Sequence, residues 1–236
     1  MELLLIIIVL SLLFDYINGF HDAANSIATI VSTKVLTPFQ AVLWAAAFNF
    51  VAFFIAKYVI GGFGIANTVS KTVMEEYITL PIILSGVIAA IIWNLFTWWL
   101  GLPSSSSHAL IGGLLGATIV KAGFSAVHFN TLMDKVIIPM FTSPVLGFCA
   151  GFMIMLLLAW IIVISKAHPD KVNKKFRKLQ LLSSGLMALS HGSNDAQKTM
   201  GIITLALMAG GVLHKGPSGE FEIPIYVILA CAITMA

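Results

Sequence analysis

Two short stretches place an aspartate beside small and amide-bearing residues within apolar sequence. Residues 18–26 read Asn-Gly-Phe-His-Asp-Ala-Ala-Asn-Ser, and residues 191–199 read His-Gly-Ser-Asn-Asp-Ala-Gln-Lys-Thr. At a constant offset of 173 residues, glycine, aspartate and alanine recur and Ser26 matches Thr199, which makes four matches in nine positions. Each copy lies inside an apolar segment. We therefore interpret the pair as an internal repeat that carries the chemistry of the chain.

Asp22 and Asp195 are the unusual residues of this repeat. A carboxylate in the middle of a membrane costs about 2.5–3.5 kcal/mol, and such residues mark functional sites. They are predicted to be cation ligands or proton carriers, although capping of a helix end is an alternative role. Lys198 could pair with an aspartate or hold an anion. Neutral oxygens and amides surround the aspartates, supplied by Asn18, Asn25, Ser26, Asn194, Gln197 and Thr199.

Glycine among polar residues predicts an interruption in each segment, near residues 18–22 and near residues 190–195. The half-helices starting near Asp22 and Asp195 would point their first amides and positive dipole ends into the gap, where anions bind. Carboxylates repel an anion unless a cation lies between them. Binding of the two ions is then coupled, as symport requires.

A serine run forms a third polar element. Residues 103–108 read Pro-Ser-Ser-Ser-Ser-His and open an apolar segment, which predicts a helix start. The hydroxyl groups could donate hydrogen bonds to a tetrahedral oxyanion. A short loop outside the membrane, with one capping serine, explains the same residues equally well.

The elements that position these groups are membrane helices. Of the 236 residues, 59% are apolar and 10% are charged, which excludes a soluble enzyme, a nucleic-acid binder and a disordered tail. A bilayer-spanning helix needs about 20 apolar residues. The sequence therefore predicts an all-α, polytopic transmembrane protein with broken helices. Seven apolar segments are expected, at about 2–33, 38–60, 80–100, 104–121, 136–165, 179–213 and from 223 onward. The last segment has 14 residues, so we expect an incomplete protein.

The basic stretch at 166–178 predicts a cytoplasmic loop by the positive-inside rule. If the segments at 80–100 and 104–121 both cross, or form one re-entrant hairpin, an odd number of crossings separates the two copies. The repeat is then inverted, the usual plan of secondary transporters. A full crossing followed by a re-entrant segment would instead give a parallel repeat. The expected division is a first repeat at 1–165, the basic loop at 166–178 and the start of a second repeat at 179–236.

The motifs resemble those of the inorganic phosphate transporter (PiT) family. Residues 19–26 look like its Gly-x-x-Asp-x-Ala-Asn-Ser/Thr signature, residues 192–198 like the second copy, and residues 103–108 like its Pro-x-Ser-Ser-x-His element. The resemblance implies phosphate import coupled to Na⁺ or H⁺, and two inverted repeats. It also implies that Asp22, Asn25 and Asp195 form the cation and phosphate site. The second signature departs from the family pattern at Lys198, and a second serine element is absent from this chain.

These arguments predict a cation-coupled phosphate symporter of the cytoplasmic membrane, with a sulfate or other oxyanion permease and an anion channel as alternatives. The sequence disfavours an intramembrane serine hydrolase, because adjacent serine and histidine residues rarely reach nucleophile–base geometry. No cofactor is expected beyond the coupling ion. The expected partners are phosphate, the bilayer and a second copy of the chain, but not nucleic acid. The predicted phosphate ligands are Asn25, Ser26, Ser104, Ser105, Ser106, Ser107, Gln197 and Thr199. The predicted cation-coupling residues are Asp22, Asn25, Asn194 and Asp195, with Asp22 and Asp195 as the metal ligands if the ion is Na⁺.

Overall fold

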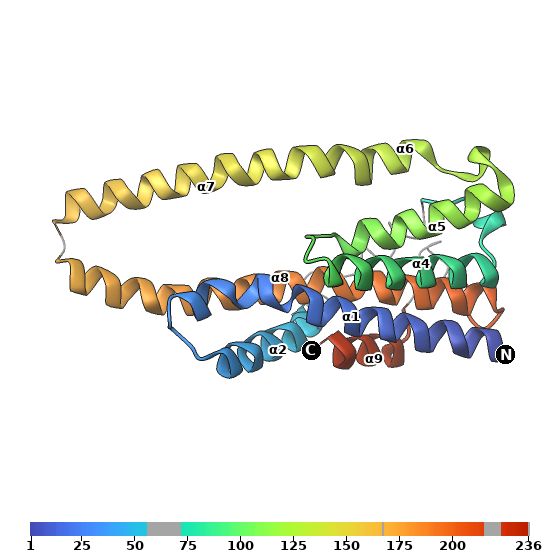
Figure 1. Cartoon of the computed structure of the whole chain (residues 1–236), viewed down its shortest axis with the longest axis horizontal. Helices are drawn as coiled ribbons and strands as arrows, with labels where there is room; N and C mark the ends of the chain where they lie inside the picture. Colours follow the sequence, from blue (N-terminus) through green and yellow to red (C-terminus); the bar gives the residue numbers. More distant parts are fainter. Residues whose placement is uncertain (56–71, 167, 215–222, 236) are drawn as a thin grey trace.

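A computed structural model describes residues 1–55, 72–166, 168–214 and 223–235, and these residues are nearly all helical (Figure 1). No strand occurs in these ranges beyond a single bridge between Val73 and Val127. The long helices are α1 (Glu2–Ser32), α2 (Pro38–Ile55), α4 (Leu80–Trp99), α5 (Ser106–Ala122), α7 (Ile138–Ser165), α8 (Pro169–Ala209) and α9 (Ile225–Met235). Short helical turns are η2 (Glu75–Tyr77), η3 (Phe124–Ala126), α6 (Phe129–Leu132) and η4 (Met133–Ile137). The predicted all-α class is confirmed.

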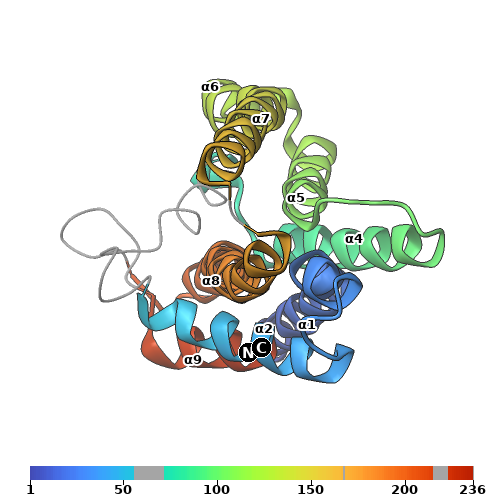
Figure 2. The ribbon, with the colours of Figure 1, turned by 90° about the vertical axis from the view of Figure 1, so that its left-hand side faces the viewer.

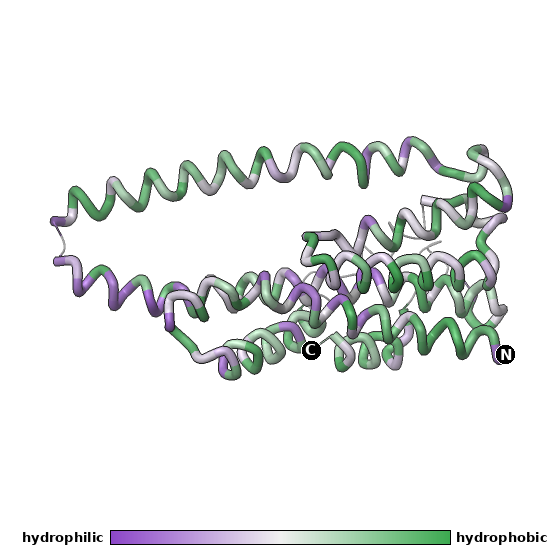
Figure 3. Tube along the Cα trace, in the orientation of Figure 1, coloured by the Kyte–Doolittle hydropathy of each residue, from purple (hydrophilic) through white to green (hydrophobic). Residues whose placement is uncertain are grey.

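Four of the described helical stretches are long and apolar enough to cross a membrane: Glu2–Ser32, Pro38–Ile55, Leu80–Trp99 and Phe129–Ser165. The last of these has 0% of its most apolar window buried, so that it presents apolar side chains on every side. Figure 3 shows this uniform hydrophobicity along α7, and Figure 2 shows α7 at the periphery with α8 near the centre. A helix that is apolar all round is suited to contact with lipid.

The other long helices pack into a bundle around one cluster of buried apolar side chains from α1, α2, α4, α5, α8 and α9, which includes Ile7, Phe14, Phe53, Ile83, Leu110, Met200 and Cys231. Lipid tails are as apolar as these side chains, so close packing rather than burial must hold membrane helices together. Glycines allow the backbones of neighbouring helices to approach each other closely. A Cβ atom on Gly113 of α5 would lie 2.5 Å from the carbonyl oxygen of Gly86 in α4.

The predicted helix breaks near residues 18–22 and 190–195 are wrong, because α1 and α8 run through both stretches without interruption. The glycines there serve packing instead. A Cβ atom on Gly192 would lie 2.7 Å from the Cα of Asn49 in α2, and one on Gly19 would lie 3.0 Å from the carbonyl oxygen of Met235 in α9. The amides around Asp22 and Asp195 therefore lie inside helices, and no half-helix end points at an anion there.

The basic stretch also differs from its prediction as a loop. Helix α8 begins at Pro169, so the basic residues from Lys171 to Lys178 lie on its first turns. The Arg177 guanidinium donates a hydrogen bond to the carbonyl oxygen of Lys34, at the end of α1. The basic residues of the α1–α2 turn and of α8 thus lie at the same end of the molecule, as the positive-inside argument requires.

Helices α1 and α8, which carry the two copies of the repeat, pack in opposite directions. The side chain of Asp15 contacts Thr199, Asn18 contacts Asp195, and Thr33 contacts Gln180, so residue numbers fall along α8 as they rise along α1. The glycine contacts are reciprocal too, because α1 meets α9 at Gly19 while α8 meets α2 at Gly192. This arrangement agrees with an inverted repeat.

Helices α4 and α5 form an antiparallel hairpin whose serine-bearing tip lies beside the first copy of the repeat. The ring of Trp98, near the end of α4, packs edge-on against Phe20 of α1 with centroids 5.7 Å apart. Figure 1 shows the tip near the middle of the long axis, alongside α1 and α8. This position favours the re-entrant interpretation of residues 80–121. The hairpin brings the serine run to the depth of the aspartates.

Candidate functional site

A polar stripe runs along one face of the otherwise apolar α1. Its members recur with helical spacing and include Ser11, Asp15, Asn18, Asp22 and Ser26. Ser11, Asp15, Asn18 and Ser26 are all at most 3% exposed. The contacts of Asp15 and Asn18 with α8 show that this stripe faces the second copy of the repeat.

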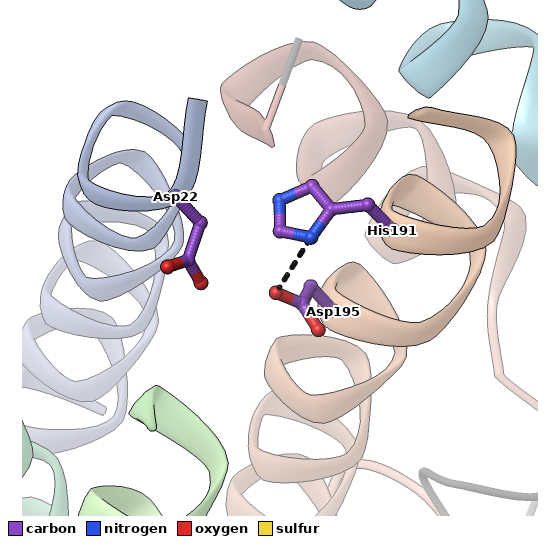
Figure 4. Close-up of side chains that lie close together, drawn as sticks. All are labelled: Asp22, His191 and Asp195. Carbon is purple, nitrogen blue, oxygen red and sulfur yellow. Dashed lines mark ion pairs between the residues drawn. The ribbon is translucent and has the colours of Figure 1, made fainter. Parts of the chain in front are cut away.

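The facing part of α8 brings His191 and Asp195 to Asp22 (Figure 4). One ligand atom from each of these three side chains lies within 4.8 Å of the others, an arrangement that could hold a cation. The Nδ1 atom of His191 is 3.4 Å from Oδ2 of Asp195. The two aspartates, 173 positions apart, therefore form one acidic cluster, as the repeat predicted.

Asp195 is the more heavily engaged aspartate. The Lys198 ammonium lies 2.5 Å from its Oδ1 atom, and the Asn18 amide donates to its Oδ2 atom at 3.2 Å. The side chains of Lys198 and Asp195 are only 8% and 11% exposed, so this is a buried ion pair. On α1, the Asn25 amide donates to Oδ1 of Asp22 at 3.2 Å, and His21 lies 3.6 Å from the same oxygen.

Asp15 belongs to the same network, whereas its place in the sequence, just before the first copy of the repeat, predicts only a semi-buried supporting residue. It is fully buried and accepts hydrogen bonds from the Thr199 hydroxyl at 2.8 Å and from the Thr234 hydroxyl at 2.9 Å. The carboxylate thereby joins α1 to both α8 and α9. Its spacing of seven residues from Asp22, on the same helical face, was the signal in the sequence that could have identified it.

The four serines of the tip have different surroundings. The Ser105 hydroxyl accepts a hydrogen bond from the backbone N–H of His108 and caps α5. Ser104 accepts one from the indole of Trp93, and Ser106 is buried. Ser107 lines the cavity beside the acidic cluster. Each interpretation of the serine run therefore holds for one residue. Ser105 caps the helix, and Ser107 faces the cavity.

The cavity has a volume of about 470 Å³ and lies between α5, α7 and α8. A single water needs about 10–15 Å³ on this measure, so the space is large enough for a hydrated ion. Its lining combines apolar side chains with hydroxyl, amide, ammonium and imidazole groups and one carboxylate. The lining residues are Ser107, His108, Ile111, Lys135, Val136, Pro139, Met140, Ser143, Asn194, Asp195 and Lys198.

The cavity thus includes only some of the predicted ligands. Ser107, Asn194 and Asp195 line it, whereas Asp22 and Asn25 lie together in the adjoining acidic cluster. Other predicted ligands are buried between helices and are not among its lining residues: Ser26, Ser106, Gln197 and Thr199. The hydroxyl of Thr199 is directed to Asp15.

Two polar residues that line the cavity from η4 and α7 were not predicted from the sequence, namely Lys135 and Ser143. Lys135 lies in η4, a π-helical turn between α6 and α7, where the widened backbone brings Lys135 and Val136 to the cavity. Such π-helical turns occur often at functional sites. Nothing in the local sequence distinguished this lysine from a charge at a membrane boundary.

Comparison with known proteins identifies the chain. The phosphate transporter family matches residues 18–236. A protein of Rhizobium meliloti (strain 1021), described as a probable low-affinity inorganic phosphate transporter, is 44% identical over 235 residues, which cover 99% of this chain and 67% of that protein. A protein of Bacillus subtilis (strain 168) with the same description is 42% identical over 237 residues, with the same coverage.

A solved structure described as the sodium-dependent phosphate transporter has the same fold, with a TM-score of 0.76 over 100% of this chain and 74% of that one. Its sequence identity is 21%, so the likeness concerns the fold alone. The family and these relatives are transporters rather than enzymes. On the strength of the family match and the two bacterial relatives, this chain belongs to the phosphate transporter family.

Proposed function

We propose that the protein carries inorganic phosphate across the membrane together with a cation. One observation carries this proposal: Asp22 and Asp195, supplied by the two copies of the repeat, meet beside a polar cavity at the tip of the α4–α5 hairpin. The bacterial relatives are described as phosphate transporters, which supports phosphate as the anion. Their bacterial origin supports a cytoplasmic membrane location.

The cation requirement follows from the charges. Two carboxylates within 4.8 Å repel each other by roughly 3.5 kcal/mol at an effective dielectric constant of about 20. Lys198 compensates Asp195. A phosphate bound next to the uncompensated Asp22 would be repelled unless a cation occupied the acidic cluster first. Each ion then increases the affinity for the other, and this reciprocity is the thermodynamic basis of symport.

The anion would occupy the cavity, where donors converge from three elements. Ser107 and His108 come from α5, Lys135 from η4 and Ser143 from α7. Hydroxyl and ammonium groups donate to oxyanion oxygens, and the ammonium contacts are charge-assisted. We propose Ser107 as the serine that binds phosphate, because the cavity lining includes Ser107 and none of Ser104, Ser105 and Ser106.

The coupling ion is Na⁺ or H⁺, since carboxylates bind either. The test uses purified protein in sealed proteoliposomes and measures radiolabelled phosphate uptake under an inward Na⁺ gradient, and separately under an inward proton gradient. Unlabelled sulfate is the competitor. Uptake driven by one gradient and resistant to sulfate supports the proposal and names the ion. Uptake that needs neither gradient would indicate a channel, and uptake lost to sulfate would indicate a sulfate carrier.

A further inference from the structure

In each copy of the repeat, the aspartate has a partner side chain three residues further along the helix. This partner is neutral in the first copy and positively charged in the second. Asn25 follows Asp22 by three residues, and Lys198 follows Asp195 by three residues. The Asn25 amide nitrogen lies 3.2 Å from Oδ1 of Asp22, and the Lys198 ammonium lies 2.5 Å from Oδ1 of Asp195. Side chains at equivalent positions of the two copies therefore each contact the Oδ1 atom of their own aspartate. Asn25 does so as a neutral donor and Lys198 as a cation.

The charge of Asp195 is thus balanced within the protein. Its partner Lys198 is buried with it, and both side chains are about nine-tenths inaccessible to solvent. A buried carboxylate is costly unless a positive charge accompanies it. Here that charge is covalently attached through the lysine side chain, and it cannot exchange with solution.

Asp22 has no such permanent partner in the described part of the chain. The one basic group recorded within ion-pair distance is His21, at 3.6 Å, which carries a charge only when it is protonated. Asn18 lies one helical turn before Asp22 on the same face and is 1% exposed. Its Oδ1 atom has no hydrogen-bond partner in this structure. The amide of the same side chain donates to Asp195, so this unpartnered buried oxygen lies at the acidic cluster and adds to its carboxylates a neutral oxygen ligand of the kind that a hard cation prefers.

From this asymmetry we infer that Lys198 is a tethered cation, which occupies at Asp195 the place that an exchangeable coupling ion takes at Asp22. The inference rests on the proposed cation-coupled transport and deepens it. The repeat contains two equivalent carboxylates, but only Asp22 binds an ion from solution. One exchangeable cation at the acidic cluster then accompanies each phosphate.

The inference is tested by making the second copy resemble the first. In the Lys198→Asn variant, Asp195 loses its tethered charge and gains a neutral amide like that of Asn25. We expect the purified variant to bind one more coupling ion per chain than the wild type, counted as bound ²²Na⁺ for a Na⁺-coupled carrier and as protons taken up per chain for a proton-coupled one. Its thermal stability should depend more strongly on that ion than the stability of the wild type does, because each ion that binds only the folded state stabilises it. The Lys121→Asn variant has the same charge change at the exposed end of α5 and should bind as many ions as the wild type.

The reverse variant, Asn25→Lys, keeps the test decisive if Lys198→Asn does not fold. It supplies a tethered charge to Asp22, and we expect phosphate uptake to lose its dependence on both the Na⁺ and the proton gradient. An unchanged ion count in folded Lys198→Asn would overturn the inference. So would a variant that loses only phosphate affinity, since Lys198 would then be an anion ligand. Failure of the proposed function is seen separately, as absence of phosphate uptake by the wild type, whatever the number of bound ions.

Discussion

Replacing Asp195 with asparagine should test the buried ion pair directly. The substitution keeps the size of the side chain but removes its charge, which leaves the Lys198 ammonium buried at 8% exposure without a counter-ion. The new amide would also direct N–H groups toward donors, because Lys198 and Asn18 both donate to the present carboxylate. Breaking a buried pair from one side costs about 3–5 kcal/mol of folding free energy. At about 2–4 °C for each kcal/mol, the midpoint of thermal unfolding should fall by roughly 6–20 °C.

The assay is thermal unfolding of the purified protein in detergent, followed by tryptophan fluorescence. The matched control is Asp170→Asn, which removes the same charge from a side chain that is 83% exposed and should leave the midpoint nearly unchanged. The double variant Asp195→Asn/Lys198→Met removes both charges and should recover most of the lost stability, because no buried charge is then left without a counter-ion. We expect the double variant to remain defective in transport. An Asp195→Asn midpoint no lower than that of the control would refute the reasoning.

Three further predictions separate coupling, anion binding and packing. Asp22→Asn should abolish gradient-driven phosphate uptake while the protein still inserts into the membrane; normal uptake by inserted protein would remove Asp22 from the cation site. Ser107→Ala should raise the phosphate concentration for half-maximal uptake, whereas Ser105→Ala should instead cost about 1 kcal/mol of stability through the lost helix cap; equal effects in both assays would contradict this division. Gly113→Ala should destabilise the α4–α5 hairpin by about 1–3 kcal/mol, because its Cβ atom would lie 2.5 Å from the Gly86 carbonyl oxygen; an unchanged unfolding midpoint would show that the two helices are not in close contact.

The helix positions could be predicted closely from hydropathy because a bilayer demands apolar stretches of nearly fixed length. The segment expected at 80–100 is α4 at Leu80–Trp99, and the segment expected at 104–121 is α5 at Ser106–Ala122. The juxtaposition of Asp22 and Asp195 was also accessible, because an internal repeat on two transporter halves implies a shared site.

The helix breaks were predicted wrongly because glycine has two uses in membrane helices. At Gly19 and Gly192 the missing side chain admits a neighbouring backbone, and the helix continues through the polar residues. Local sequence alone does not distinguish this use from an interruption, since the deciding partners lie in α9 and α2. The intact backbone satisfies its own hydrogen bonds, which in a membrane favours continuity.

The site residues that were missed depend on contacts between distant parts of the chain. The burial of Asp15 arises from Thr199 and Thr234, which lie 184 and 219 positions away. Lys135 lies in a π-helical turn and lines the cavity together with residues of α5 and α8, which are separate elements. Hydropathy describes one segment at a time, so it could not reveal these long-range contacts. The spacing of seven residues from Asp22 pointed to Asp15, but no such signal marked Lys135.

The most direct test of cation-coupled phosphate transport is the reciprocal flux. Proteoliposomes with equal Na⁺ and equal pH on both sides would receive an inward phosphate gradient, and ²²Na⁺ entry and internal pH would be recorded together. Coupling requires that phosphate drive its partner ion, so we expect one of the two cations to accumulate against its own gradient, and the Asp22→Asn variant to show no accumulation. Phosphate entry that moves neither Na⁺ nor protons would contradict the account.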